Sequence, residues 1–268
     1  MHGRGFEPVQ SPPGRGHRPA GRRRVAVLNE GRPAAADRLA QVLARIEAAC
    51  AAAGRRTDEI TLIAVGKGIP AEQVTELLVL GVTDVGENKA QEAAAKAAEI
   101  ASRRPELAAR WHFIGQLQRN KAGSVAAFAS MVHSVDRPAL VAALDRSAAR
   151  RERPLDVLLQ LDLDPDLDPA RGGVAPGDFA ALADAVLGVE HLLLRGVMTV
   201  APPGADARRS FERLVEFSES LQVIAPSATV VSAGMSADLE AAISAGATHV
   251  RVGTALFGAR KLASEHRT

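Results

Sequence analysis

Residues 61–86 read TLIAVGKGIPAEQVTELLVLGVTDVG, and this stretch decides the fold class. It begins with the apolar run TLIAVG (61–66), continues with a helical pattern over 71–80 and ends with a second run, VTDVG (82–86). An apolar run without polar alternation is typical of a strand that is buried on both faces, as the strands of parallel sheets are. The stretch therefore predicts a strand, a helix and a second, parallel strand.

The same alternation continues along the chain. Further helical patterns lie at 33–53, 87–101, 118–128, 138–150, 177–187, 206–223 and 236–245. Further strand-like runs lie at 110–115, 131–135, 156–162, 192–198, 228–233 and 247–253. Eight strands that alternate with helices over about 200 residues match a (β/α)8 barrel better than an open doubly wound sheet. The dinucleotide fingerprint G-x-G-x-x-G is also absent after the first strand. We predict a single α/β domain over 33–268, a TIM-type (β/α)8 barrel.

The composition is that of a globular protein. Apolar residues make up 47% of the 268 residues and charged residues 24%, which excludes wholesale disorder. No run approaches the ~18 apolar residues that a membrane helix needs. A single Cys50 can form neither an internal disulfide nor a multi-thiolate metal site. We expect a cytoplasmic protein with no membrane contact and no metal site.

Residues 1–32 differ from the rest of the chain. They hold seven Arg and two Glu, are rich in Gly and Pro, and show no apolar periodicity, so we predict a disordered extension. They lack the apolar region of a secretory signal. Residues 33–268 carry 26 basic against 29 acidic groups, a net charge of −3, and aromatic residues are only 3% of the chain. With few aromatic side chains to stack on bases, we expect no nucleic-acid partner.

Candidate chemistry lies where the predicted strands end, because barrel enzymes act at the carboxyl ends of their strands. Lys67 follows the first strand and is one of five Lys in a chain with 28 Arg. A Lys there is by default a solvated charge, but a partly desolvated amine condenses with aldehydes. Gly-Met-Ser (234–236) opens the predicted helix 236–245 and Gly-Thr-Ala (253–255) opens the next turn, so N–H groups and hydroxyls converge where barrels bind phosphate. An amine facing a phosphate site suggests pyridoxal 5′-phosphate (PLP).

A series of motifs carries a family resemblance. They are AVGKGIP (64–70), VGENKAQE (85–92), WHFIGQLQRNK (111–121), SVDR (134–137), RGVMTV (195–200), GMSADLEAAI (234–243) and HVRVGTALFGAR (249–260). In this order and spacing, over about residues 60–260, the chain resembles the pyridoxal phosphate homeostasis protein family, also called the proline synthetase co-transcribed homologue family. The resemblance implies a single-domain barrel of fold type III, similar to the N-terminal domain of alanine racemase.

The resemblance also implies which residues bind the cofactor. At positions that match the family motifs these are Lys67, Asn88, Met235, Ser236, Arg251, Gly253 and Thr254. Lys67 matches the lysine that forms the internal aldimine with PLP. Ser236, Gly253 and Thr254 match phosphate-binding positions, and Met235 lies beside that loop. Asn88 matches a residue near the cofactor ring, and Arg251 should approach the pyridine nitrogen.

Some positions depart from the family pattern. Gly66 stands where a hydroxyl residue is usual, Lys89 where an aromatic residue is common, and Arg-Gly-Gly (171–173) replaces a Lys-x-Gly sequence. None of them belongs to the cofactor-binding set. His112 is typical of the family, but a His on an apolar strand is more often structural than an acid–base group. The Asp-rich loop 163–175 lacks EF-hand spacing, so we predict no calcium site.

Two classes of function stay open. A racemase needs an acid–base group on each face of the cofactor, and racemases supply the second as a Tyr from another domain, whereas this chain has no Tyr. A binding protein needs only the amine, the phosphate site and an open barrel end. An Arg partner also leaves the ring nitrogen unprotonated, which weakens the ring as an electron sink.

We therefore expect a monomeric PLP-binding protein that holds PLP as the Lys67 aldimine and takes part in intracellular PLP homeostasis without catalysis. PLP-dependent apo-enzymes and amino acids are further possible partners. The alternative is a cryptic PLP-dependent racemase-like enzyme. A third class, nucleic-acid binding through residues 1–32, would show as salt-dependent DNA retention that is lost when they are removed.

Overall fold

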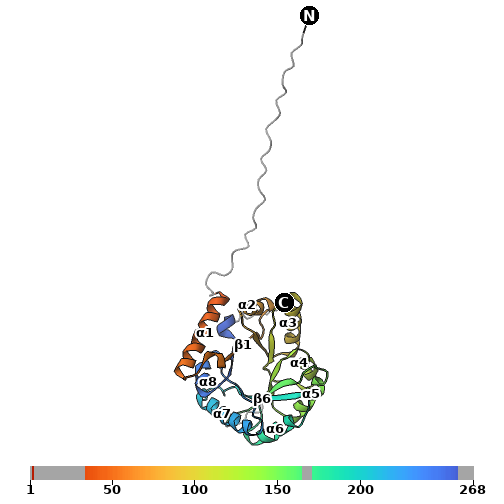
Figure 1. Ribbon diagram of the computed structural model, residues 1–268, viewed down its shortest axis with the longest axis vertical. Helices are drawn as coiled ribbons and strands as arrows, with labels where there is room; N and C mark the ends of the chain where they lie inside the picture. The colour runs from red at the N-terminus through yellow and green to blue at the C-terminus, as the bar shows by residue number, and fades with distance from the viewer. Residues whose placement is uncertain (1, 3–33, 165–170, 259–268) are drawn as a thin grey trace, which may run out of the picture. The chain divides into compact units, whose positions relative to one another are not determined.

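The computed structural model describes residue 2, residues 34–164 and residues 171–258. The chain divides into two units, residues 1–32 and 33–268, and the second is the subject below. Apart from His2, the extension predicted to be disordered lies outside the described residues. In the second unit, eight parallel strands form a closed barrel in which each strand pairs with the next and β8 pairs with β1 (Figure 1).

The strands are β1 (Thr61–Val65), β2 (Asp84–Glu87), β3 (Arg110–Phe113), β4 (Met131–Val135), β5 (Leu155–Gln160), β6 (Leu192–Met198), β7 (Val230–Ser232) and β8 (His249–Val252). The helices are α1 (Ala35–Ala52), α2 (Ala71–Val79), α3 (Ala90–Arg103), α4 (Ala122–Phe128), α5 (Pro138–Ala148), α6 (Phe179–Leu187), α7 (Ala207–Ile224), α8 (Leu239–Ala245) and α9 (Thr254–Phe257). In Figure 1 helices surround the ring of strands. The predicted barrel is confirmed.

Burial on both sides explains the unbroken apolar strands. All five residues of β4 are buried, because helices cover the outside of the barrel and side chains fill its interior. On α5 the buried residues Leu140, Val141 and Leu144 recur at helical spacing and face the strands. Burying such a side chain contributes about 1.5–3 kcal/mol. The barrel core is therefore the layer between strands and helices.

Two predicted helix boundaries were wrong for identifiable reasons. We expected a helix from residue 87, but Glu87 still pairs with Phe113 in the β2–β3 ladder, so α3 begins at Ala90. We also expected a helix from residue 236, but α8 begins at Leu239. There the Asp238 carboxylate accepts the Met235 N–H at 2.5 Å and holds a turn ahead of the helix.

The part of the chain that the structure describes contains neither a membrane-spanning helix nor a cluster of metal-ligating side chains. None of its helices is long and apolar enough to cross a membrane. Within the same residues, no group of three or more His, Cys, Asp and Glu could hold a metal ion.

Candidate functional site

Lys67 lies at the mouth of the barrel, meaning the end at which the strands terminate. It follows β1 by two residues, and its side chain is exposed. Two hydrogen bonds hold the backbone of the preceding Gly66. Its N–H donates to the Gly86 carbonyl at 2.9 Å, and its carbonyl accepts from Lys96 Nζ at 2.7 Å. The chain that carries Lys67 is therefore anchored just below the amine.

Lys96 and Glu87 form a buried ion pair beneath this strand end. Lys96 Nζ contacts Glu87 Oε1, and both residues are buried. Glu87 Oε2 has no hydrogen-bond partner among the described residues. Burial raises the pKa of Glu87, and Lys96 opposes the rise. A Cβ at residue 66 would lie 3.0 Å from Glu87 Oε1, so the buried pair leaves little room for a side chain at this position.

Asn88 begins the loop after β2, next to the end of β1. The β1–β2 register pairs Val65 with Gly86, so this loop starts beside Lys67. Its backbone packs against Gly115, where a Cβ would lie only 2.3 Å from the Asn88 carbonyl oxygen. Only glycine fits at residue 115, and its lack of a side chain lets the loops that follow β2 and β3 pack against each other.

The loops after β7 and β8 meet on the other side of Lys67. Gly234 turns the chain with a φ of +85°, and its carbonyl accepts the Arg251 N–H at 2.9 Å. The Ser236 hydroxyl accepts the Ala255 N–H at 3.5 Å, which brings the two loops together. A Cβ on Gly253 would lie 3.4 Å from Val65, so the loop after β8 lies beside the end of β1.

The structure thus gathers most of the predicted site residues at one rim. The side chains of Lys67, Met235 and Thr254 are exposed there, and Asn88, Ser236 and Gly253 are half-buried. Helix α1 braces this rim from outside, because Arg45 donates to the Ser236 carbonyl at 2.9 Å and pairs with Glu240 on α8.

Arg251 differs from the others because it lies inside the barrel. It is 4% exposed, donates from Nη1 to Ser232 Oγ at 2.7 Å and donates from Nη2 to the Thr199 carbonyl at 2.8 Å. Burial lowers the pKa of Arg251 to about 10, with Asp238 opposing the change, so the guanidinium stays cationic at neutral pH.

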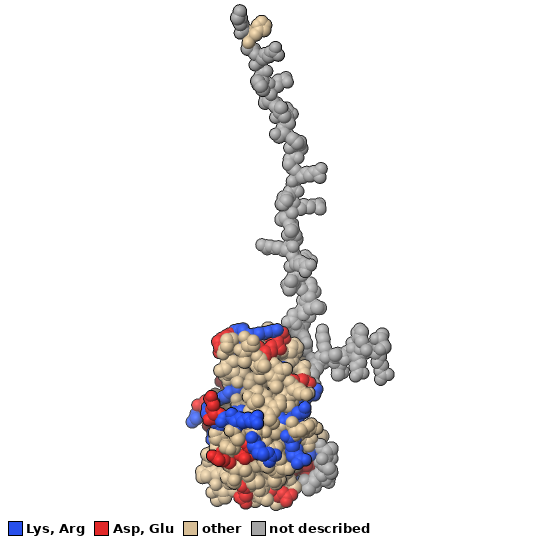
Figure 2. Space-filling view, turned by 90° about the vertical axis from the view of Figure 1, so that its right-hand side faces the viewer, with Lys and Arg blue, Asp and Glu red and all other residues tan. Residues whose placement is uncertain are grey.

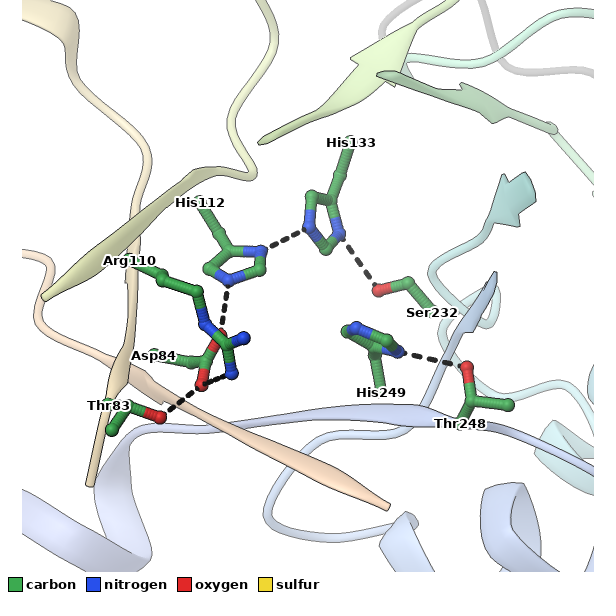
Figure 3. Close-up of polar contacts among 8 residues, drawn as sticks. All are labelled: Thr83, Asp84, Arg110, His112, His133, Ser232, Thr248 and His249. Atoms are coloured by element: carbon green, nitrogen blue, oxygen red, sulfur yellow. Dashed lines mark hydrogen bonds and ion pairs between the residues drawn. The ribbon is translucent and has the colours of Figure 1, made fainter. Parts of the chain in front are cut away.

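A row of polar side chains continues from Arg251 through the barrel interior, and Figure 3 draws its part from Ser232 to Asp84. Ser232 Oγ lies 3.0 Å from His133 Nδ1, His133 Nε2 lies 2.9 Å from His112 Nδ1, and His112 Nε2 lies 2.8 Å from Asp84 Oδ1. Asp84 begins β2, at the opposite end of the barrel from the mouth. We call Asp84, His112, His133, Ser232 and Arg251 the interior chain.

Known proteins match the chain over most of its length. The family model described as alanine racemase, N-terminal domain, matches residues 38–261. The pyridoxal phosphate homeostasis protein of Mycobacterium leprae is 44% identical over 240 residues, covering 84% of this chain and 93% of the relative. That of Escherichia coli is 37% identical over 231 residues, covering 84% and 96%. This chain belongs to the pyridoxal phosphate homeostasis protein family. The resemblance found in its motifs is confirmed.

Solved structures agree with this membership. A structure of PipY from Synechococcus elongatus with PLP bound, a 35% identical protein, matches with a TM-score of 0.72 and covers 84% of this chain and 100% of that one. Alanine racemase from Corynebacterium glutamicum matches with a TM-score of 0.56 at 16% identity, covering 84% and 62%. The second likeness shows a shared fold alone.

Sequence reasoning missed several residues around the site of this family member. Lys96 was detectable, because it occupies a position of the apolar face of α3 between Ala93 and Ala97, and Lys is rare in the chain. Arg45 and the partners of His112 gave no local signal, because their contacts join elements that are far apart in sequence.

Proposed function

We propose that this chain binds PLP covalently through Lys67 and serves PLP homeostasis by holding the cofactor rather than by catalysing a reaction of it. The observation that carries the proposal is the placement of Lys67. Lys67 is exposed and lies between the loop that begins at Asn88 and the loops that contain segments 234–236 and 253–255.

The chemistry of the donors at the mouth fits PLP. Its aldehyde takes up a primary amine, for which Lys67 is placed. The Ser236 hydroxyl, which accepts the Ala255 N–H, and the exposed Thr254 hydroxyl are hydrogen-bond donors suited to a phosphate. Arg251 presents a cation below them, held at two points, and we assign it to the ring nitrogen. Met235 and Asn88 complete the proposed site.

The surroundings of His112 favour holding over catalysis. The sequence left open whether His112 is a structural residue or an acid–base group. Both of its ring nitrogens are occupied, by Asp84 and by His133, and the ring is 3% exposed. An acid–base group at Cα of a substrate needs a free nitrogen at the mouth. His112 does not offer one.

The face of the barrel drawn in Figure 2 gives no support to nucleic-acid binding. On the face in Figure 2, acidic side chains lie among the basic ones rather than apart from them. Several Arg side chains are paired with carboxylates, among them Arg103 with Glu99 and Arg208 with Glu212. A monomeric state, a cytoplasmic location, and apo-enzymes or amino acids as partners stay predictions.

Replacing Lys67 tests the attachment. Lys67→Ala should abolish the visible absorbance that PLP gains on attachment to protein, and borohydride reduction followed by peptide mapping should label Lys67 in the unaltered chain. Lys89→Ala is the matched control, because Lys89 is exposed in the neighbouring loop and pairs with the exposed Glu92. A label on Lys89, or absorbance that survives in Lys67→Ala, would place the site elsewhere.

Amino-acid turnover tests the absence of catalysis. Alanine and serine incubated with PLP-loaded protein should keep their configuration when followed by chiral chromatography. Sustained turnover that disappears in Lys67→Ala would favour the racemase-like alternative, and its loss in His112→Asn as well would identify His112 as the second acid–base group.

A further inference from the structure

The interior chain crosses the barrel from one end to the other. Asp84 stands at the start of β2 and pairs at two points with Arg110, whose side chain is 61% exposed. Arg251 stands near the end of β8, below the mouth. The residues between them are each 3% exposed or less, so no bulk water competes for their hydrogen bonds.

The donors and acceptors of this chain can be assigned one after another. Burial opposes ionisation of Asp84, but hydrogen bonds from His112, Arg110 and Thr83 outweigh it and hold the pKa of Asp84 well below its usual range. An ionised carboxylate only accepts, so His112 Nε2 carries hydrogen. The 2.9 Å contact between His112 Nδ1 and His133 Nε2 holds one hydrogen, and we place it on His133 Nε2, because Arg110 already balances the charge of Asp84 at the far side of the His112 ring.

The assignment continues to Arg251. Burial, aided by the charge of Arg251, lowers the pKa of His133 well below its ordinary value. A neutral His133 with hydrogen on Nε2 leaves Nδ1 as an acceptor, so the Ser232 hydroxyl donates to it. The lone pairs of Ser232 Oγ then accept from Arg251 Nη1. Every bond in the chain donates toward Asp84.

The charges around the chain favour this arrangement. The other ionisable groups that face it are Arg110 at one end, Asp238, whose charge acts on Arg251 at the other end, and His249, whose ring centroid lies 6.3 Å from that of His112. Burial lowers the pKa of His249 to about 4, so His249 is neutral. Arg110 already balances the charge of Asp84. A further cation on His112 would be a buried charge without a counter-ion of its own.

We propose that Asp84, His112, His133 and Ser232 are positioning residues that fix the guanidinium of Arg251 through a one-directional hydrogen-bonded chain. Because the Ser232 hydrogen is committed to His133, Ser232 always offers a lone pair to Arg251, and with the Thr199 carbonyl it holds the planar guanidinium at two points. The remaining N–H groups of Arg251 are thereby aimed in one direction. That these groups meet the cofactor ring rests on the proposed function.

The direction of the hydrogen bonds in the interior chain is measurable without any cofactor. The full-length protein with 15N-labelled histidine, before PLP is added, should show His112 and His133 both protonated on Nε2 and unprotonated on Nδ1 in long-range 1H–15N spectra at pH 7.5. The variants His112→Gln and His133→Asn assign the two signals. A hydrogen on His133 Nδ1, or a doubly protonated His112, would reverse the chain and overturn the proposal.

A matched pair of variants measures what the chain does for binding. Leu and Asn are similar in size, but only the Asn side chain has an oxygen near the place of His133 Nδ1 that can accept from Ser232. His133→Leu should weaken PLP binding roughly tenfold and shift its visible absorbance, since a hydrogen bond that orients a charged group is lost. His133→Asn should stay within about threefold of the unaltered chain.

Ser232→Ala provides the same measurement if His133→Leu does not fold, because it removes the acceptor of Arg251 directly. We expect the same roughly tenfold loss. The proposal is overturned if His133→Leu binds PLP with the affinity and absorbance of the unaltered protein. If His133→Leu is unfolded, the same result in Ser232→Ala overturns it. Either result counts even if Lys67→Ala abolishes attachment as expected. Attachment that survives in Lys67→Ala refutes the proposed function instead and leaves the histidine spectra as the test of the chain.

Discussion

Replacing Lys96 by Met should destabilise the protein strongly, because Lys96 is buried beneath the mouth as the partner of Glu87. Met keeps most of the side-chain volume and removes the ammonium. The Glu87 carboxylate, 0% exposed and already without a partner for Oε2 among the described residues, then loses its counter-ion. Breaking a buried ion pair in this way costs about 3–5 kcal/mol. The Gly66 carbonyl also loses the bond from Lys96 Nζ.

Urea unfolding at pH 7.5 measures the free energy of unfolding. The double variant Glu87→Gln/Lys96→Met is the control, because it leaves no buried charge at the pair. Replacing both charges is often close to neutral, so we expect the double variant to be more stable than Lys96→Met alone. If Lys96→Met lowers the free energy of unfolding by less than about 1 kcal/mol, the view that the buried Glu87 carboxylate needs Lys96 as its counter-ion is refuted.

The pH dependence provides an independent check. Burial already raises the pKa of Glu87, and removing Lys96 takes away the interaction that opposes the rise. In Lys96→Met the folded state therefore binds a proton more readily than the unfolded chain, and stability falls as pH increases between the unfolded and folded pKa values. The loss in free energy of unfolding that Lys96→Met causes, relative to the unaltered protein, should be smaller at pH 5 than at pH 7.5. A loss that is larger at pH 5 contradicts the assignment of the effect to Glu87.

Three further outcomes are expected. Ser236→Ala and Thr254→Val should each weaken PLP binding about 10- to 150-fold in equilibrium titrations, since each loses a hydrogen bond to a dianion worth ~1.5–3 kcal/mol; unchanged affinity in both would place the phosphate elsewhere. Arg45→Ala should weaken PLP binding several-fold by releasing the Ser236 loop, while Arg103→Ala, which removes two exposed ion pairs, should not. Equal effects of the two variants on PLP affinity would show that Arg45 does not hold this loop. Deleting residues 1–32 should leave the melting temperature and PLP affinity unchanged, and a drop in either would show that the extension contributes to the barrel.

The sequence alone was enough to predict the barrel because its signals are local. A strand covered on both faces reads as an unbroken apolar run, and a helix packed on one face repeats its apolar residues every three or four positions. Both patterns need only neighbouring residues. The boundary errors arose where another interaction competed, as at Asp238, whose carboxylate holds Met235 in a turn and delays the start of α8.

The rim of the site could be predicted for a related reason. All strands of a parallel barrel end on the same side, so residues that directly follow strands must gather there, whatever their separation in sequence. The order of strands along the chain is therefore sufficient to place Lys67 at the same end of the barrel as segments 234–236 and 253–255. The family motifs then suggested a role for each residue.

The interior chain and the buried pair could not be predicted in this way. His112, His133 and Ser232 come from three strands, and which of their side chains meet depends on how β3, β4 and β7 are staggered around the closed barrel. Lys96 approaches Glu87 only because α3 turns that face toward the end of β2. Sequence patterns report that a strand is buried, whereas the stagger of the strands decides which side chains meet inside the barrel, and only the tertiary structure contains that information.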